Sequence, residues 1–331
     1  MTEIGDGIHR IEAEVGGRPL YLFLFLGERK LLLDAGCSTT VEASILPYLA
    51  RLGLGPRDLD MLLVTHPDLD HQGGAHSLAA ANPNLTVACG TLDRALVSDP
   101  EAVLERRYGA YRAAHGIDYD DETTAWMREM CGEAQQVDRV FAGGERIELA
   151  PGWDLSVFHV PGHSAGHLAV QDSRTGAFFS GDCVQGSVYL GLDGTPKLCP
   201  TYTDVDPYLE TIERVRTLAP NELHGCHWPA ARGLEVDAFL DESRAYVEHL
   251  DELVRTCLVE AESGLALREL IARVNERLER PWPPGVAAEL VYSLNGHVER
   301  LVEEGAARAE RAGDGGTIVY RSEESPIGSA A

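Results

Sequence analysis

The chain has 331 residues, of which 44% are hydrophobic and 24% are charged, a composition typical of a globular protein with a sizeable core. Its formal net charge of -25 and its pI near 4.8 disfavour nucleic acids and anionic membrane surfaces as partners. The seven cysteines include no CxxC pair, which favours reduced thiols and a cytoplasmic location over a disulfide framework.

Residues 1–90 alternate between predicted strands and helices. The N-terminal residues 1–15 lack both the basic region and the apolar core of a signal peptide, and no apolar run approaches the roughly 20 residues of a membrane helix. Continuous apolar runs predict buried strands at residues 21–27, 30–36, 61–65 and 85–90. Residues 39–54 show helical spacing, with Ser38 or Thr39 as the predicted N-cap.

Residues 91–136 differ from this pattern because they are helical in spacing, highly charged and rich in aromatic residues. We predict a helical insertion that packs over one edge of the main domain. Its Tyr108, Tyr111 and Trp126 fit two interpretations, a substrate pocket or ordinary core packing. Strand signals return at residues 139–162 and 176–182, followed by a helix at 204–220 and a short strand at 221–225.

Residues 236–331 are predicted to form a small C-terminal domain. Amphipathic helices at residues 265–278 and 296–307, an apolar segment at 286–294 and a hairpin at 307–321 together resemble a winged-helix unit. Winged helices often bind DNA, but acidic residues offset the arginines of this region and leave no net basic face. A packing role or a homodimer contact is therefore the expected function.

Four segments each place a metal-competent side chain in a turn that follows a predicted strand. They are residues 64–74 with His66, Asp68, Asp70 and His71, residues 160–167 with His163, residues 178–182 with Asp182, and residues 223–229 with His224 and His227. A sheet whose strand ends face one side would bring these turns together. Two divalent ions roughly 3.5–4 Å apart need such nitrogen and oxygen ligands, including one bridging carboxylate.

With these motifs in this order, residues 4–235 resemble the metallo-β-lactamase superfamily, whose members carry T-H-x-H-x-D-H-x-G-G, P-G-H, S/T-G-D and a final histidine. The resemblance implies an α/β fold, the αββα sandwich, in a catalytic domain that covers residues 1–235. Some relatives of the glyoxalase II type also carry a small C-terminal winged-helix unit. The resemblance implies that Asp34 and His167 orient metal ligands, and it assigns the ligands themselves as follows: His66, residue 68 and His163 on a first metal, Asp70, His71 and His227 on a second, with Asp182 between them.

Position 68 departs from the family pattern because it is aspartate where histidine is usual. A carboxylate is an anionic, harder ligand than imidazole, so Asp68 should shift the preference of the first metal from zinc toward manganese or iron. In the alternative interpretation, Asp68 points away from the site and binds its own loop.

Several neighbouring residues are also candidates for the site. Cys183 and Cys226 adjoin Asp182 and His227, so a thiol ligand is conceivable, although free cysteine is more often a small buried residue. His227 fits the final histidine of the family better than His224, which is expected to be a strand residue. Tyr202 either contacts substrate or packs in the core.

The function that these observations favour is a cytoplasmic dinuclear metallohydrolase that opens an ester, thioester or lactone of a small molecule. In that mechanism a hydroxide that bridges the two ions attacks the carbonyl, and Asp70 orients this nucleophile and passes its proton on. One alternative is an iron-dependent oxidoreductase or dioxygenase, although no flavin-binding segment is evident. The other is a phosphodiesterase or nucleic-acid-binding relative, which the acidic charge opposes.

Overall fold

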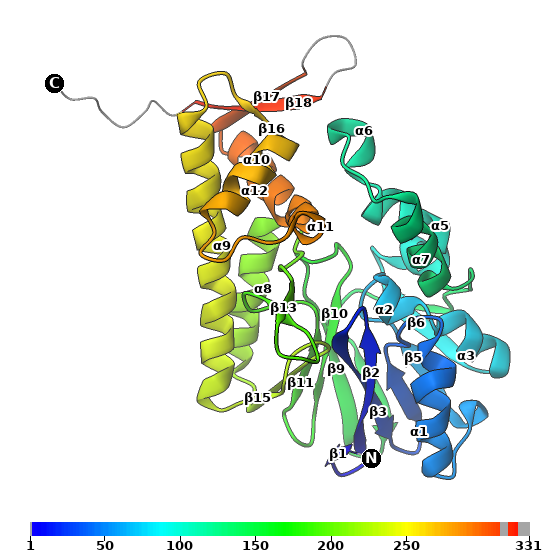
Figure 1. The fold of residues 1–331 in the computed structure, drawn as a ribbon. Coiled ribbons are helices and arrows are strands. Elements are labelled where there is room, and N and C mark those ends of the chain that lie inside the picture. The colour runs from blue at the N-terminus through cyan, green and yellow to red at the C-terminus, as the bar shows by residue number, and fades with distance from the viewer. Residues whose placement is uncertain (1, 312–316, 324–331) are drawn as a thin grey trace.

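Two β-sheets packed face to face form the centre of the molecule, and helices cover both outer faces (Figure 1). This computed structural model describes residues 2–311 and 317–323. The arrangement is the αββα sandwich that the sequence predicted.

The first sheet contains seven strands that follow one another in both sequence and space. They are β1 (Thr2–Gly5), β2 (Ile8–Val15), β3 (Arg18–Leu26), β4 (Lys30–Leu33), β5 (Met61–Leu63), β6 (Thr86–Gly90) and β7 (Arg139–Phe141). Strands β1 to β4 are antiparallel, whereas β4 to β7 are parallel neighbours. The predicted strands of residues 1–90 are confirmed, while β1 and β2 were not predicted.

The second sheet contains six strands in the order β15-β14-β11-β10-β9-β8. Their bounds are β8 (Arg146–Ala150), β9 (Trp153–His159), β10 (Leu168–Asp172), β11 (Phe178–Gly181), β14 (Glu222–Gly225) and β15 (Ala231–Arg232). Strands β11 and β14 are parallel, so their carboxyl ends lie at the same edge. A separate hairpin joins β12 (Tyr189–Leu190) to β13 (Pro196–Leu198).

Aromatic side chains fill the space between the two sheets. Phe23 and Phe25 of β3 contact the ring of Phe179 of β11 edge to face, with centroid distances of 4.8 and 5.0 Å. All three side chains are buried, as expected for strands covered on both faces. This core fixes the relative position of the two sheets and therefore of the loops at their edges.

Helices from residues 41–81 cover the outer face of the first sheet. A π-helical turn (Val41–Ile45) leads into α1 (Leu46–Arg51), and a 3₁₀ turn (Pro56–Asp58), α2 (Leu69–Gln72) and α3 (Ala75–Ala81) follow. The predicted cap at Ser38 or Thr39 is wrong, because the helical segment begins after Thr40 without a side-chain cap. The Thr40 hydroxyl instead accepts a hydrogen bond from the backbone N–H of Cys37 at 3.0 Å.

The predicted insertion at residues 91–136 is helical and packs beside α2. It contains α4 (Arg94–Ser98), α5 (Pro100–Val103), a π-helical turn (Leu104–Tyr108), α6 (Arg112–His115) and α7 (Asp121–Cys131). The backbone N–H of Ser38 donates to the carbonyl of Met130 at 2.9 Å, and the Ser38 hydroxyl donates to the carbonyl of Glu129 at 2.7 Å. These bonds hold α7 against the main domain.

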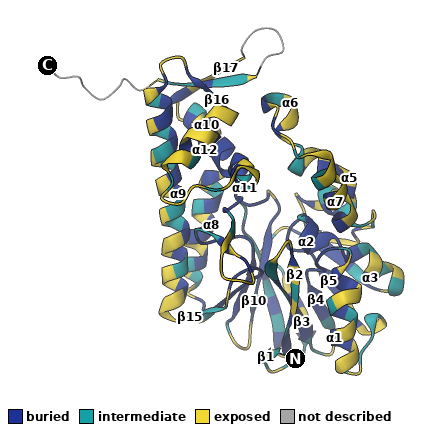
Figure 2. Ribbon diagram, in the orientation of Figure 1, coloured by how far each residue is buried: buried dark blue, intermediate teal, exposed yellow. Residues whose placement is uncertain are grey.

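The outer face of the second sheet is covered by α8 (Val205–Leu218) and the long α9 (Leu234–Glu260) (Figures 1 and 2). Helix α9 crosses the domain boundary predicted between residues 235 and 236. The remaining elements are β16 (Leu265–Ala266), α10 (Leu267–Arg277), α11 (Pro284–Ala287), a 3₁₀ turn (Ala288–Leu290), α12 (Val291–Glu303), β17 (Ala307–Arg311) and β18 (Ile318–Ser322). The two strands of the hairpin predicted at residues 307–321 are present as β17 and β18, and residues 312–316 between them lie outside the described residues.

All seven cysteines are free and buried. Within residues 2–311 and 317–323, no helix combines the length and apolarity needed to cross a bilayer.

Candidate metal centre

The predicted metal ligands converge because the strands that precede them end at one edge of the sandwich. His66 follows β5, His163 follows β9, Asp182 follows β11 and His227 follows β14. All four side chains are buried. The loops carry these residues as the sequence predicted, and their side chains form two adjacent groups.

The first of these, the four-residue group, contains Asp70, His71, Asp182 and His227. Nε2 of His227 lies 3.3 Å from Oδ2 of Asp70 and 3.5 Å from Oδ2 of Asp182. Nε2 of His71 lies 3.9 Å from an oxygen of each carboxylate. Two imidazoles and two carboxylates thus direct nitrogen and oxygen atoms toward one small space.

This four-residue group fits a divalent cation. Nε2 of His71 and Oδ1 of Asp182 are buried without a hydrogen-bond partner in the described part of the chain, which is costly unless a ligand binds them. Nδ1 of His71 is bound by Asp34 and Nδ1 of His227 lies 2.8 Å from the carbonyl of Pro19, so each Nε2 remains directed at the centre. Imidazole nitrogen and carboxylate oxygen are ligands that zinc, manganese and iron accept.

Asp34 lies behind the group in a backbone conformation that is rare for a residue with a side chain, with φ at 63°. Its carboxylate accepts hydrogen bonds from the backbone N–H and the hydroxyl of Thr65 at 2.7 and 2.9 Å. Asp34 and Asp70 outweigh the effect of burial, which opposes the charged form, and raise the pKa of His71 well above its ordinary value.

His167 orients the loop of Asp182. Its Nε2 accepts a hydrogen bond from the backbone N–H of Asp182 at 3.1 Å, and its ring stacks on His66 with a centroid distance of 4.7 Å. Gly181 precedes Asp182 with φ at 52°, and a Cβ at this position would lie 2.8 Å from the His167 ring. The glycine of the S-G-D motif is therefore required by both its backbone conformation and its close contact with His167.

The second group, the three-residue group, contains His66, Asp68 and His163. Oδ2 of Asp68 lies 3.0 Å from Nε2 of His163 and 3.5 Å from Nε2 of His66, and Nε2 of His66 is buried without a hydrogen-bond partner among the described residues. Asp68 therefore faces the two histidines and does not point away from them.

Arg107 of the insertion binds this three-residue group, and the sequence did not indicate it. Its Nε and one terminal nitrogen donate to the two oxygens of Asp68, the second of these bonds at 2.8 Å. The guanidinium also lies 3.1 Å from Nε2 of His163 and donates to the carbonyl of His163 at 3.0 Å. Although burial opposes ionisation, the charge of Arg107 holds the pKa of Asp68 well below its ordinary value.

A cleft of about 200 Å³ opens above both groups. Tyr108 and Trp126 line it, as one interpretation of the insertion predicted. Several further wall residues were not identified from the sequence, among them Arg18, Arg107, Tyr119, Tyr189, Glu289 and Tyr292. Four separate parts of the chain contribute these residues, namely β3, the insertion, β12, and the 3₁₀ turn with the start of α12.

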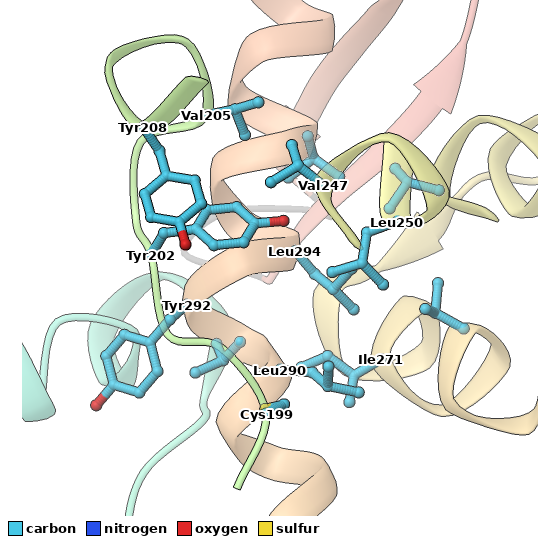
Figure 3. Close-up of a cluster of buried hydrophobic side chains, with 14 of the residues drawn as sticks. Cys199, Tyr202, Val205, Tyr208, Val247, Leu250, Ile271, Leu290, Tyr292 and Leu294 are labelled. Atoms are coloured by element: carbon cyan, nitrogen blue, oxygen red, sulfur yellow. The ribbon is translucent and has the colours of Figure 1, made fainter. Parts of the chain in front are cut away.

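Two aromatic residues predicted for the pocket lie elsewhere. Tyr202 is fully buried against Tyr208 and donates to or accepts from Nε2 of His297 at 2.8 Å, so it is a core residue (Figure 3). Tyr111 is also buried and does not line the cleft, because its ring packs edge to face behind Tyr292 at 5.5 Å. Residue type alone therefore did not predict which aromatic side chains line the pocket and which pack in the core.

The remaining candidates lie outside the two groups. His224 is a strand residue whose ring stacks on Phe179 and whose Nε2 lies 3.1 Å from Glu222. Cys226 lies 3.8 Å from Asp34, and burial raises the pKa of its thiol to about 12, which disfavours a thiolate ligand. Burial likewise raises the pKa of Cys183 well above its ordinary value.

Comparison with known proteins agrees with this geometry. The family described as the metallo-beta-lactamase superfamily matches residues 16–227. Acyl-coenzyme A thioesterase MBLAC2 of Gallus gallus is 28% identical over 237 residues, which cover 66% of this chain and 76% of that protein. Hydroxyacylglutathione hydrolase of Bdellovibrio bacteriovorus is 25% identical over 184 residues, which cover 54% of this chain and 53% of that protein.

Solved structures share the fold over nearly the whole chain. A metallo-beta-lactamase family protein from Thermus thermophilus has a TM-score of 0.74 and 22% identity, with 96% of this chain and 99% of that chain covered. A beta-lactamase domain protein from Burkholderia ambifaria has a TM-score of 0.72 and 20% identity, with 97% and 93% covered.

Proposed function

The chain belongs to the metallo-beta-lactamase superfamily, and from this premise we propose that it is a metal-dependent hydrolase of a small acyl thioester. The observation that carries the proposal is the four-residue group, whose two carboxylates and two imidazoles converge at the floor of an aromatic cleft. The names of two relatives, a thioesterase and an acylglutathione hydrolase, favour a thioester over the simple esters and lactones that the sequence left open.

In this proposal Asp70, His71, Asp182 and His227 hold a divalent ion. When bound, such an ion supplies a Lewis acid and lowers the pKa of water toward neutrality. Asp70 lines the cleft, where its carboxylate orients the attacking water and accepts its proton. Tyr189 donates to Oδ2 of Asp182 at 3.0 Å and so fixes the second carboxylate.

The lining and volume of the cleft indicate which acyl group the substrate carries. Tyr108, Tyr119, Trp126 and Tyr292 provide an aromatic wall that excludes water from the acyl group. A volume of about 200 Å³ favours a short acyl chain, while the thiol half of the substrate extends into solvent. The cytoplasmic location, the homodimer and the winged-helix character of residues 236–331 remain predictions.

A panel of short and medium acyl thioesters tests the proposed function, with release of the free thiol as the measurement. We expect at least one thioester to be hydrolysed, activity to disappear with a chelator, and activity to return when a divalent ion is added. The variant His71→Ala should lose at least 1,000-fold in kcat/KM, about 4 kcal/mol. His224→Ala is the matched control, because His224 is a buried histidine outside both groups.

Failure to cleave any thioester with zinc, manganese and iron each supplied would overturn the proposal. Full activity in the His71→Ala variant would do the same. Lactones and aryl esters in the same panel show whether the thioester is preferred.

A further inference from the structure

We propose that Arg107 is the permanent cation of the three-residue group, so that this hydrolase binds one divalent ion rather than two. The single ion belongs to the four-residue group, and the inference rests on the proposed function only for the presence of that ion. Of the two metal positions that the sequence predicted, one would then hold an ion and the other would hold the guanidinium of Arg107.

The hydrogen bonds of Arg107 occupy the atoms that a second ion would need. A guanidinium can only donate, so its hydrogen bonds engage both carboxylate oxygens of Asp68, and one terminal nitrogen lies 3.1 Å from Nε2 of His163, where it stands close to the ring nitrogen that would bind an ion. Two of the three predicted ligands of the first metal are thereby engaged. Only His66 keeps a free ring nitrogen within the described part of the chain, and this nitrogen groups with ligand atoms of His71 and Asp182, so it would add to the single ion of the four-residue group and not hold a second one.

The charges of the two groups also favour an ion in the four-residue group and none in the three-residue group. In the three-residue group the single carboxylate of Asp68 is neutralised by Arg107, and both side chains are largely buried. A divalent ion added there would lie beside a guanidinium in a medium of low dielectric constant, which is unfavourable. In the four-residue group, the ion pairs and hydrogen bonds of Asp70 and Asp182 within the described residues involve histidine and tyrosine and no arginine.

Two hydrogen bonds of neighbouring residues hold the turn that carries Arg107 in this position. The residue lies in a π-helical turn in which the N–H of Gly109 donates to the carbonyl of Leu104 at 2.9 Å, and such turns often occur at functional sites. The next residue, Tyr108, accepts a hydrogen bond from the N–H of Leu69 at 3.0 Å, which ties the turn to the loop of Asp68. Arg107 is therefore a built part of the site.

The geometry also leaves Arg107 able to act on substrate. Its hydrogen bonds to Asp68 and to the carbonyl of His163 use three of the five N–H bonds of a guanidinium. Arg107 lines the cleft, so a remaining N–H can donate to the carbonyl oxygen of a thioester. The side chain would thus stabilise the negative charge that develops on this oxygen.

Titration of the metal-free protein with cobalt(II) tests the inference, with visible absorption and metal analysis after desalting as readouts. We expect the wild-type protein to saturate at one equivalent. Arg107→Met frees Asp68 and His163, so this variant should bind a second equivalent. Arg112→Met is the matched control, because Arg112 is an exposed arginine of the same insertion, and it should remain at one equivalent.

Two equivalents in the wild-type protein would overturn the inference, as would a single equivalent in a folded Arg107→Met variant. If Arg107→Met does not fold, Arg107→Lys keeps the positive charge and should stay at one equivalent. The number of equivalents that the wild-type protein binds then tests the inference without the Met variant. The two proposals fail separately. Two equivalents with chelator-sensitive thioester hydrolysis would leave the proposed function intact, whereas one equivalent without any hydrolysis would overturn the function alone.

Discussion

The carboxylate of Asp34 accepts a hydrogen bond from Nδ1 of His71 at 2.9 Å, with both side chains fully buried. This contact fixes the ring orientation of His71 and leaves its Nε2 directed at the four-residue group. A residue 37 positions away in the sequence therefore fixes the direction in which Nε2 of His71 points.

We expect Asp34→Asn to weaken metal binding by about 10- to 100-fold, because an amide does not reproduce both the charge and the hydrogen bonds of the carboxylate. Competition with a chromophoric chelator measures the affinity. Asp60→Asn is a suitable control, since Asp60 accepts a backbone hydrogen bond from Lys30 at 2.7 Å far from the site. Affinity within twofold of the wild-type value would contradict the role of Asp34.

Arg18 provides a second cation at the rim of the cleft. Its Nε is buried and has no hydrogen-bond partner in the described part of the chain. We expect Arg18→Met to raise the KM of a thioester with an anionic acyl group by about tenfold, the loss of one charge-assisted hydrogen bond, and to leave kcat within twofold. A neutral acyl group of the same length should be unaffected.

Arg10→Met is the control for Arg18, because Arg10 lies on the neighbouring strand and pairs with Glu12 at 2.7 Å. Equal effects on anionic and neutral substrates would show that Arg18 does not bind the acyl group.

Glu289 lines the cleft, and the protonation of its carboxylate should change near neutral pH. Burial raises its pKa from 4.5 to about 7, and the Tyr119 hydroxyl donates to its carboxylate at 2.9 Å. Because the folded protein binds this proton more tightly than the unfolded chain, its contribution to stability is complete below about pH 4.5 and is lost as the pH rises through 7. The free energy of unfolding should therefore fall by about 3 kcal/mol across this window relative to Glu289→Gln.

Urea unfolding of the wild-type protein and of Glu289→Gln at several pH values measures this difference. A constant difference from pH 4.5 to pH 7.5 would contradict the raised pKa.

Tyr202 should affect stability and not catalysis. Tyr202→Phe leaves the buried Nε2 of His297 without its partner, which costs about 1–2 kcal/mol in the free energy of unfolding. Its kcat and KM should match those of the wild-type protein. Trp126→Ala provides the contrast, since Trp126 lines the cleft and is partly exposed: we expect a raised KM with little change in stability.

The sequence predicted those parts of the site that are encoded locally. Each metal-competent side chain follows a buried strand, and parallel strands bring their carboxyl ends to one edge, so motif and sheet together predict the cluster. Asp34 and His167 followed from the family resemblance in the same way. Their hydrogen bonds in the structure agree with the expected orienting roles.

The partner of Asp68 could not be predicted in this way. Arg107 is 39 positions away in a helical insertion, and neither periodicity nor residue type distinguishes it from the adjacent Arg106. The positions of Tyr111 and Tyr202 stayed open in the sequence for a related reason, because an aromatic residue in a helix or loop suits either a pocket or a core. Which of the two it enters depends on how α12 packs, a contact far away in the sequence.

Different segments of the chain provide the proposed metal ligands and the wall of the cleft, and this has a consequence for how the substrates of such proteins diverge. The proposed metal ligands come from the strand ends of the sandwich, whereas Trp126 and Tyr292 come from the insertion and the C-terminal helices. Substitutions in these outer segments can change which acyl group is accepted while the hydrolytic chemistry is inherited unchanged. Two homologues with the same motifs can therefore differ in substrate, and residues 91–136 and 284–303 are the regions to compare before an activity is transferred between them.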